Sequence, residues 1–408
     1  MHHSDKQLVP AGPFHITIGG ALVLLLKQKI TNKIKSEGPI SFETFMSIAL
    51  YDPEFGYYTR PSAIIGRAGD FYTSPHLHMI FGMMIGRQME EMWEVMGRPD
   101  RFQIVEMGAG MGHLAKDILD YIVTRELSGH IDYSIVELNP AVREQQQTLI
   151  GAHAGKVRWF TGLADIGTVE GCFLSNELLD ALPVHLVVKR DELMEVFVSM
   201  ADEHGHTLTE VERPCNSTIG AYLQDFSADL PKGYKTEVNL KIKDWLAEAS
   251  KKLERGFILT IDYGYSSAEY YSEERSAGTL LCYYKHQVNE DPYQHIGEQD
   301  ITAHVNFSSV RKWGEELGLR TEGYCPQGTY LVSLGIDEVI TEMYGDSPDS
   351  FSTQKNRGFL VDPFEMAKIK GLIFPQGMGA SHQVMVQSKG INEVKLRGFT
   401  FRNHAGRL

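Results

Sequence analysis

The stretch FQIVEMGAGMGHL, residues 102–114, has residue types that could hold a nucleoside. Its apolar start predicts a strand, Glu106 follows, and the glycines at positions 108, 110 and 112 predict a tight loop that opens a helix. Such a backbone can approach a ligand closely, because glycine has no Cβ atom. The third glycine of the dinucleotide fingerprint is missing, and so is the Gly-Lys-Ser/Thr ending of a phosphate-binding loop. The loop therefore favours a ligand without phosphate.

A second acid, Glu137, should lie beside this loop at the end of the next strand. S-adenosylmethionine carries a sulfonium and an ammonium group and no phosphate, so it suits a lysine-free loop preceded by an acid. Glu137 would bind its ribose hydroxyls, as an acid does in dinucleotide sites, although the gap after Gly112 is longer than the usual gap of roughly 20 residues. The alternative is a glycine turn that only reverses the chain, with Glu137 a solvated acid. We favour the cofactor site and assign to it Glu106, Gly108, Ala109, Gly110, Gly112, Glu137 and Leu138.

The methyl acceptor should bind where the segment SNELLDALPV, residues 175–184, leaves the fourth strand. In a parallel sheet the carboxyl ends of the strands border the ligand crevice, so Asn176, Glu177 and Asp180 should emerge there. On a helix, residues three apart share a face, and two carboxylates could hold a cationic nitrogen for in-line methyl transfer. The alternative is that Asn176 only caps a helix. His304 is a further catalytic candidate, either as a proton relay or as a structural histidine.

The composition argues against several other kinds of protein. A formal net charge of −14 disfavours nucleic acid as a main partner, because phosphate contacts need clustered Lys and Arg. The four cysteines are scattered without a Cys-x-x-Cys pair, which indicates a reducing compartment and no zinc-ribbon site. His76 and His78 have no third ligand nearby, so we expect no metal. The apolar run at 16–26 is too short to span a bilayer. We expect a cytoplasmic protein, or a mitochondrial matrix protein in a eukaryote.

Strands and helices alternate from Arg101 onward, which is the pattern of a parallel α/β sheet. An antiparallel meander is expected in the connection at 184–213, where the apolar residues alternate. The expected strands of the main sheet are 103–106, 133–136, 157–160, 172–175, 257–261, 319–324 and 383–387. The expected helices are 21–35, one that follows Ser41 as its cap, 79–96, 238–253, 307–317 and 330–344.

Motifs along most of the chain resemble those of the MidA-like methyltransferases. They are ALYDPEFGYYT (49–59), GDFYTSP (69–75), VEMGAGMGHL (105–114), NELLDALPV (176–184), IDYGY (261–265), GTLLCYY (278–284), GEQDITAHVNF (297–307) and QGMG (376–379). The resemblance implies a class I methyltransferase fold, with a Rossmann-like seven-stranded, mostly parallel α/β sheet whose last strand is antiparallel. It implies S-adenosylmethionine as the methyl donor. It also places Asp70, Thr73 and Ser74 of the GDFYTSP motif near that cofactor.

The resemblance further implies a protein as the substrate. The family includes a mitochondrial protein arginine methyltransferase needed for the assembly of respiratory complex I, so we expect a protein arginine, with respiratory-complex subunits as candidate partners. Glu177 and Asp180 would face its guanidinium. Family members usually carry acids where this chain has His76, Met83 and Asn306, which makes the rim of its acceptor site less acidic.

The expected domain organisation follows from the same resemblance. Residues 1–100 would form an N-terminal helical lid, and residues 101–408 a methyltransferase domain with an inserted substrate subdomain at 187–254. Two other functions stay open at this point, a small-molecule N- or O-methyltransferase and a non-catalytic assembly factor that has retained the fold. The intact glycine loop and its two acids argue against the assembly factor.

Overall fold

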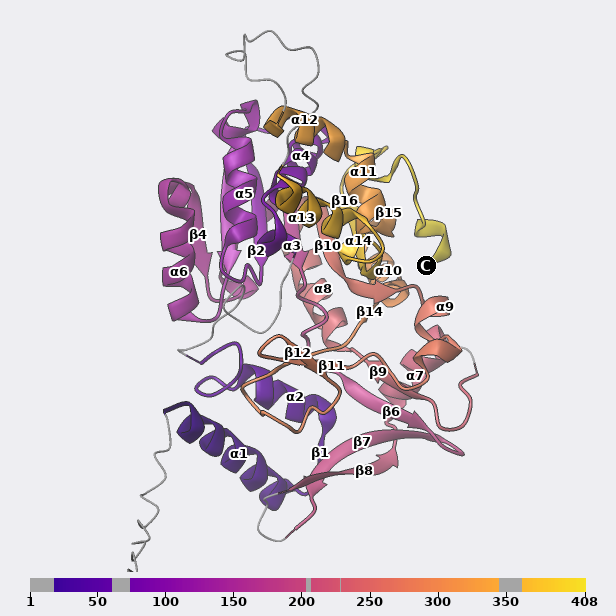
Figure 1. Ribbon diagram of the computed structural model, residues 1–408. Coiled ribbons are helices and arrows are strands. Elements are labelled where there is room, and N and C mark those ends of the chain that lie inside the picture. The colour runs from indigo at the N-terminus through magenta and orange to yellow at the C-terminus, as the bar shows by residue number, and fades with distance from the viewer. Residues whose placement is uncertain (1–17, 61–73, 203–206, 228, 345–361) are drawn as a thin grey trace, which may run out of the picture.

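The computed structural model describes residues 18–60, 74–202, 207–227, 229–344 and 362–408. Figure 1 shows a large sheet with helices packed around it in the upper part and a smaller, antiparallel sheet in the lower part. None of the helices within these ranges combines the length and the apolar character that crossing a lipid bilayer requires.

The large sheet has eight strands, of which seven form one continuous order. The strand that comes last in the chain is antiparallel to both of its neighbours, whereas the other pairs in this order are parallel. The mostly parallel α/β sheet agrees with the sequence prediction, although several strands are longer than expected and the eighth strand was not expected. In spatial order the seven are β15 (Arg320–Pro326), β16 (His382–Lys389), β10 (Leu253–Tyr265), β5 (Val169–Asn176), β2 (Phe102–Met107), β3 (Ile131–Val136) and β4 (Val157–Phe160), and β14 (Val305–Asn306) pairs with β10.

Helices pack on both faces of this sheet (Figure 1). The single helix expected at 330–344 is two helices, because Gly335 takes a left-handed φ of 84° between them and ends the first. The helices around the large sheet are α3 (Ser74–Leu77), α4 (Ile80–Val95), α5 (His113–Ile122), α6 (Pro140–Ile150), α8 (Lys241–Lys252), α9 (Ser267–Tyr270), α10 (Phe307–Glu316), α11 (Gln327–Ser333), α12 (Ile336–Tyr344), α13 (Pro363–Ile373) and α14 (Met378–Ser381).

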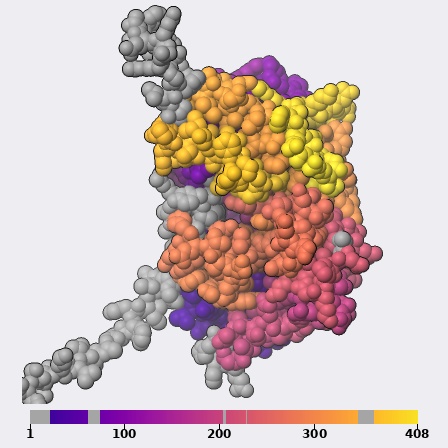
Figure 2. All heavy atoms as spheres, turned by 45° about the vertical axis from the view of Figure 1, so that its right-hand side comes forward, coloured from indigo at the N-terminus to yellow at the C-terminus, as the bar shows by residue number. Residues whose placement is uncertain are grey.

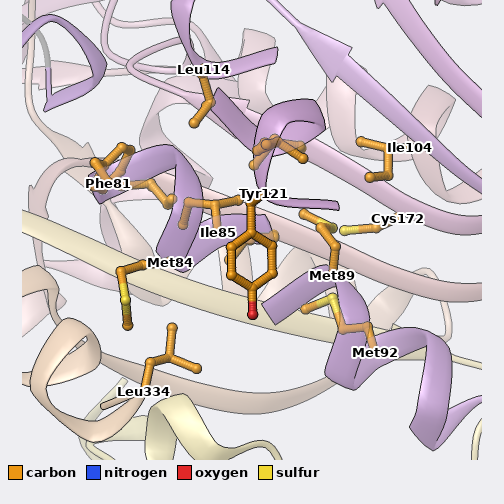
Figure 3. Close-up of a cluster of buried hydrophobic side chains, with 14 of the residues drawn as sticks. Phe81, Met84, Ile85, Met89, Met92, Ile104, Leu114, Tyr121, Cys172 and Leu334 are labelled. Carbon is orange, nitrogen blue, oxygen red and sulfur yellow. The ribbon is translucent and has the colours of Figure 1, made fainter. Parts of the chain in front are cut away.

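The apolar runs of the central strands are buried on both sides, because neighbouring residues of a strand point to opposite faces. In β2, Ile104 packs into the apolar cluster that contains α4 and α5, whereas Val105 packs into the cluster on the other face with α8 and α10. Figure 3 shows the first cluster, with Met84 and Met89 of α4 among its buried side chains. The methionine-rich helix is therefore part of the core, as its apolar stripe predicted.

The second sheet contains the predicted meander. Its order is β1 (Ile40–Ser41), β7 (Leu193–Met200), β6 (His185–Lys189) and β9 (Lys235–Val238), and β8 (Leu208–Pro214) pairs with β7. Three helices contact the strands of this second sheet, namely α1 (Ile18–Glu37), α2 (Phe42–Tyr51) and α7 (Ser217–Phe226).

The N-terminal segment contributes to both parts of the molecule. Ser41 caps α2, as expected, by accepting a hydrogen bond from the Thr44 N–H at 3.2 Å. Apolar residues of α1 and α2 share a core with Val198 of β7 and with Val184, directly before β6, whereas α4 packs beside the large sheet. The boundaries at residue 100 and at 187–254 stay predictions.

A small three-stranded sheet completes the fold. It consists of β12 (Gln287–Asn289), β11 (Leu281–Tyr284) and β13 (Asp300–Thr302), in that order. On the face in Figure 2, the salmon-coloured segment that carries these strands lies between the C-terminal residues in yellow and the second sheet in magenta.

Candidate functional site

A cavity of about 360 Å³ opens where β2, β3 and β5 end. Of the described residues that line it, none is a lysine or an arginine, so the cavity suits a ligand without phosphate. Its walls combine the glycine loop with acids, aromatic residues and two histidines. They include Tyr51, Tyr58, His76, Glu106, Gly108, Ala109, Gly110, His113, Glu137, Leu138, Asn176, Glu177 and Trp245.

The glycine loop is held in place by Gln146 of α6. The Gln146 Nε2 donates to the carbonyl oxygen of Gly110 at 2.8 Å and to Glu137 Oε2 at 3.3 Å. The side chain is fully buried, and its Oε1 accepts a hydrogen bond from Trp159 at 2.9 Å. Gly112 has a φ of 90° and leaves room for this contact, because a Cβ atom there would lie 3.3 Å from Gln146 Cγ. Gln146 therefore joins the loop to the predicted ribose acid, and no motif in the sequence marked it.

Glu106 is a buried acid at the floor of the cavity. Its Oε2 accepts a hydrogen bond from the Tyr133 hydroxyl at 2.7 Å. Burial raises the pKa of Glu106 to about 7, and the hydrogen bond from Tyr133 opposes this increase. A cation bound nearby would therefore shift Glu106 from its protonated form to the charged carboxylate. Burial likewise raises the pKa of Glu137 at the end of β3.

The structure separates the other predicted cofactor residues into three groups. Ala109 and Leu138 line the cavity. Gly112 and Ser74 do not line the cavity. Gly112 directly precedes α5, and the buried Ser74 hydroxyl donates to Gln327 Oε1 at 3.1 Å. Asp70 and Thr73 lie outside the described residues.

The segment after β5 is a turn, and the helix expected there is absent from residues 177–184. Glu177 takes a left-handed φ of 52°, and its N–H donates to the Ile261 carbonyl oxygen of β10 at 2.9 Å. Asp262 accepts hydrogen bonds from the N–H groups of Leu178 and Leu179 at 3.2 and 2.8 Å. The backbone of the turn is thus bonded to the neighbouring strand, and the Asp262 carboxylate caps the turn.

One carboxylate oxygen of Glu177 is anchored. Oε1 receives the Ser74 N–H at 3.3 Å and the Asn176 Nδ2 at 3.2 Å, whereas Oε2 forms no hydrogen bond with the described part of the chain. Asn176 Oδ1 is a buried acceptor that likewise has no partner among these residues. Both residues line the cavity, so these two oxygens are candidate acceptors for the N–H groups of a ligand.

Asp180 and His304, two of the predicted catalytic residues, do not line this cavity. Asp180 is buried, and burial together with the charges of Asp262, Glu177 and Asp300 raises its pKa well above the usual range. The expectation that Glu177 and Asp180 share a helix face is wrong, because the turn directs them differently. His304 lines a separate cavity and stacks on Tyr263 at a ring distance of 6.0 Å.

His304 also has a pKa that burial lowers to about 4, with Arg275 and His382 acting in the same direction. Because the ring is neutral at physiological pH, it does not supply a positive charge to the methyl-transfer site.

The N-terminal segment supplies residues that sequence reasoning missed. Tyr51 and Tyr58 line the cavity, although their motif (49–59) had served only as evidence of the family resemblance. The Asn139 Nδ2, two residues after Glu137, donates to the carbonyl oxygens of Tyr58 and Arg60 at 3.0 and 3.1 Å. The turn that carries the ribose acid is therefore bonded directly to the N-terminal segment. The signal available in the sequence was the high aromatic content of residues 51–58.

Comparison with known proteins agrees with this geometry. A family model of S-adenosyl-L-methionine-dependent methyltransferases matches residues 84–325. The crystal structure of a Burkholderia thailandensis protein bound to S-adenosyl-homocysteine is 31% identical to this chain, with a TM-score of 0.84, covering 98% of this chain and 100% of that one. The chain belongs to this methyltransferase family. Its methyl donor is S-adenosylmethionine.

Curated relatives of this methyltransferase include mitochondrial enzymes. "Protein arginine methyltransferase NDUFAF7 homolog, mitochondrial" of Drosophila melanogaster is 28% identical and spans 88% of this chain and 86% of its own length. "Protein arginine methyltransferase NDUFAF7, mitochondrial" of Rattus norvegicus is 29% identical and spans 82% and 80%. The resemblance noted in the sequence is thus confirmed over most of the chain.

The residues of the cavity fit this donor. S-adenosylmethionine supplies an electrophilic methyl group on a positively charged sulfur. Glu137 would bind its ribose hydroxyls, and the buried carboxyl of Glu106 would favour its cationic groups. The loop between Gly108 and Gly112 lets the backbone approach the nucleoside. Among the described lining residues, only the two histidines could carry a positive charge that repels the sulfonium.

For His76 and His113, which line the same cavity, burial lowers the pKa, to about 4 in the case of His76. Both rings are therefore neutral near pH 7, so they do not repel the sulfonium.

Proposed function

We propose that this methyltransferase transfers the methyl group to nitrogen and that its acceptor is an arginine side chain of a partner protein. The observation that carries the proposal is that Asn176 and Glu177 both line the cavity and that Glu177 Oε2 and Asn176 Oδ1 have no hydrogen-bond partner among the described residues. A guanidinium presents N–H donors in a planar fork, so it can satisfy two neighbouring acceptors at once. The names of the relatives, protein arginine methyltransferases, support the same acceptor.

In this proposal Asn176 and Glu177 orient the attacking nitrogen. Methyl transfer is an in-line displacement, so the position of the lone pair matters more than the strength of a base. The Glu177 side chain is only 6% exposed, and a carboxylate shielded from water stabilises a neighbouring cation more strongly than an exposed one. Its Oε2 can then accept the proton that the methylated nitrogen releases.

The parts around the cavity are proposed to bind the partner. Residues 1–100 would act as a lid, supported by the presence of Tyr51 and Tyr58 in the cavity wall. The segment 187–254 would shape the acceptor groove. The net charge of −14 suits a basic partner better than nucleic acid.

The compartment is proposed to be the bacterial cytoplasm or, in a eukaryote, the mitochondrial matrix. All four cysteines are free, which is consistent with a reducing compartment, and the named relatives are mitochondrial.

The experiment that tests the function combines transfer of label with identification of the acceptor. The purified protein is mixed with radiolabelled S-adenosylmethionine and a lysate from cells that lack this gene, and labelled proteins are digested and searched for methyl-arginine by mass spectrometry. We expect label in a discrete protein band, with respiratory-complex subunits as the first candidates to search. Label confined to small molecules would instead support a small-molecule methyltransferase. Complementation of the deletion by a transfer-dead variant would support a non-catalytic assembly factor.

A further inference from the structure

A buried histidine lies behind the anchored oxygen of Glu177. His382 is the first residue of β16 and faces Tyr263 across the antiparallel pair with β10. Its side chain is fully buried, its Nε2 lies 3.4 Å from Glu177 Oε1, and its ring lies 3.9 Å from the ring of Tyr263. The last strand of the sheet therefore brings a nitrogen to a carboxylate that comes from the opposite side of β10.

The neighbours of the imidazole determine which nitrogen faces Glu177. His382 Nδ1 lies 3.2 Å from the Ser381 hydroxyl, which can donate to it. Nε2 then carries the hydrogen, and it forms no hydrogen bond of good geometry with the described residues. Glu177 Oε1 lies 3.4 Å from Nε2, and the two form an ion pair only when the ring is doubly protonated. Nε2 is thus the nitrogen of the imidazole that lies beside the carboxylate, without a hydrogen bond to it in this arrangement.

Three nitrogens consequently surround the same oxygen, two of them as hydrogen-bond donors and His382 Nε2 as a close polar contact. The Ser74 N–H, the Asn176 Nδ2 and the His382 Nε2 all lie 3.2 to 3.4 Å from Glu177 Oε1. A carboxylate without such anchors rotates about its terminal bond and exchanges its two oxygens. With Oε1 held from three sides, Oε2 is the oxygen that remains available at the cavity.

We propose that His382 is a positioning residue for methyl transfer, which holds Glu177 Oε1 so that Oε2 stays directed at the acceptor nitrogen. The inference rests on the proposed function of Glu177. His382 itself does not line the cavity, so it acts through Glu177 and does not touch the donor.

The test compares two substitutions at position 382. His382→Phe keeps a planar ring against Tyr263 and removes the nitrogen beside Glu177 Oε1, so kcat should fall about 10-fold, as for loss of a polar contact to a charged group. The dissociation constant for S-adenosyl-homocysteine, measured by isothermal titration, should stay within about 2-fold of the wild-type value. His382→Gln places an amide donor near the position of Nε2 and should recover kcat to within about 3-fold of the wild type.

A double-mutant cycle and a matched control separate positioning from a general structural effect. In the Glu177→Gln background, His382→Phe should cause no further loss of kcat, because the carboxylate that it positions is gone. His185→Phe removes another histidine–glutamate pair, His185 Nδ1 with Glu195 Oε1 at 2.7 Å in the second sheet, and should leave kcat unchanged.

Several outcomes would overturn the inference. They are an unchanged kcat in His382→Phe, a His382→Gln variant as slow as His382→Phe, or fully additive losses in the cycle. If His382→Phe does not fold, Ser381→Ala gives a second test, with an expected fall in kcat of about 3-fold because the imidazole loses the partner of Nδ1. If the wild-type protein labels no arginine, the proposed acceptor fails, and the same comparison is made on whichever acceptor carries the label.

Discussion

Gln146 and Gly110 are joined by a 2.8 Å hydrogen bond that ties a helix side chain to the backbone of the glycine loop. The same Nε2 lies 3.3 Å from Glu137 Oε2, so one amide contacts both the glycine loop and the predicted ribose acid. This makes the orientation of the predicted ribose acid depend on α6 as well as on the strand that carries it.

Replacement of Gln146 should weaken donor binding. Gln146→Ala removes both contacts, and we expect the dissociation constant for S-adenosyl-homocysteine to rise about 10-fold, the effect of losing hydrogen bonds that pre-organise a site. Gln145→Ala, one residue earlier on the exposed side of the same helix, is the matched control and should bind as the wild type does. Isothermal titration of the three proteins is the measurement. Equal affinities would show that Gln146 has only a structural role.

The two acids after β5 should differ sharply in their effect on transfer. Glu177→Gln removes the charge at the cavity, and we expect kcat to fall about 100-fold while donor affinity is retained. Asp180→Asn is the matched control, because Asp180 is buried outside the cavity wall and should leave kcat within about 3-fold of the wild type. Labelled-donor assays on the identified acceptor give both rates. A large loss in Asp180→Asn would restore the role that the sequence suggested for it.

Glu106 should make folding stability depend on pH. Its folded-state pKa of about 7 lies above the ordinary value of 4.5. The folded state therefore binds the proton more tightly, and its stability falls as the pH rises from about 4.5 to about 7. Over this window the free energy of unfolding of the wild type should decrease relative to Glu106→Gln by on the order of 3 kcal/mol.

Urea unfolding at several pH values measures this difference. Burial also raises the pKa of Asp117 and Asp262 to about 7, but these two acids are present in both proteins and cancel in the comparison. Glu144→Gln, at an exposed position, serves as the control. Parallel pH curves for Glu106→Gln and the wild type would contradict the assignment.

Asn139 should keep the N-terminal segment attached to the cofactor turn. Asn139→Ser retains a side chain that can cap α6 but loses the amide that bonds the carbonyl oxygens of Tyr58 and Arg60. We expect amide exchange at Thr59 and Arg60 to become about 10-fold faster, because their local opening becomes easier.

Hydrogen exchange followed by mass spectrometry reports this change, and the amides of α2 provide the internal control. Exchange that is unaltered at Thr59 and Arg60 would mean that the segment is held by its other contacts, such as the hydrogen bond from Tyr58 to Asp300 at 2.7 Å.

Much of the sheet followed from local patterns. The apolar run from Phe102 to Val105 is buried on both faces, and this burial is what makes a central parallel strand readable in a sequence. The predicted positions of the strand ends were less accurate. The expected strand at 257–261 extends to Leu253–Tyr265, because its ends are set by pairing with β5, β14 and β16 and not by its own residues.

The sequence by itself indicated the class of ligand, since a glycine loop without lysine and two acids at strand ends argue against phosphate and favour a cationic nucleoside. Only the tertiary structure decided which acid reaches the cavity and what holds it. Glu177 reaches the cavity and Asp180 does not, because the turn between them is bonded to β10. Gln146 and His382 could not be identified in advance, because each meets its partner through strands or helices that are far apart along the chain, and such contacts leave no local pattern.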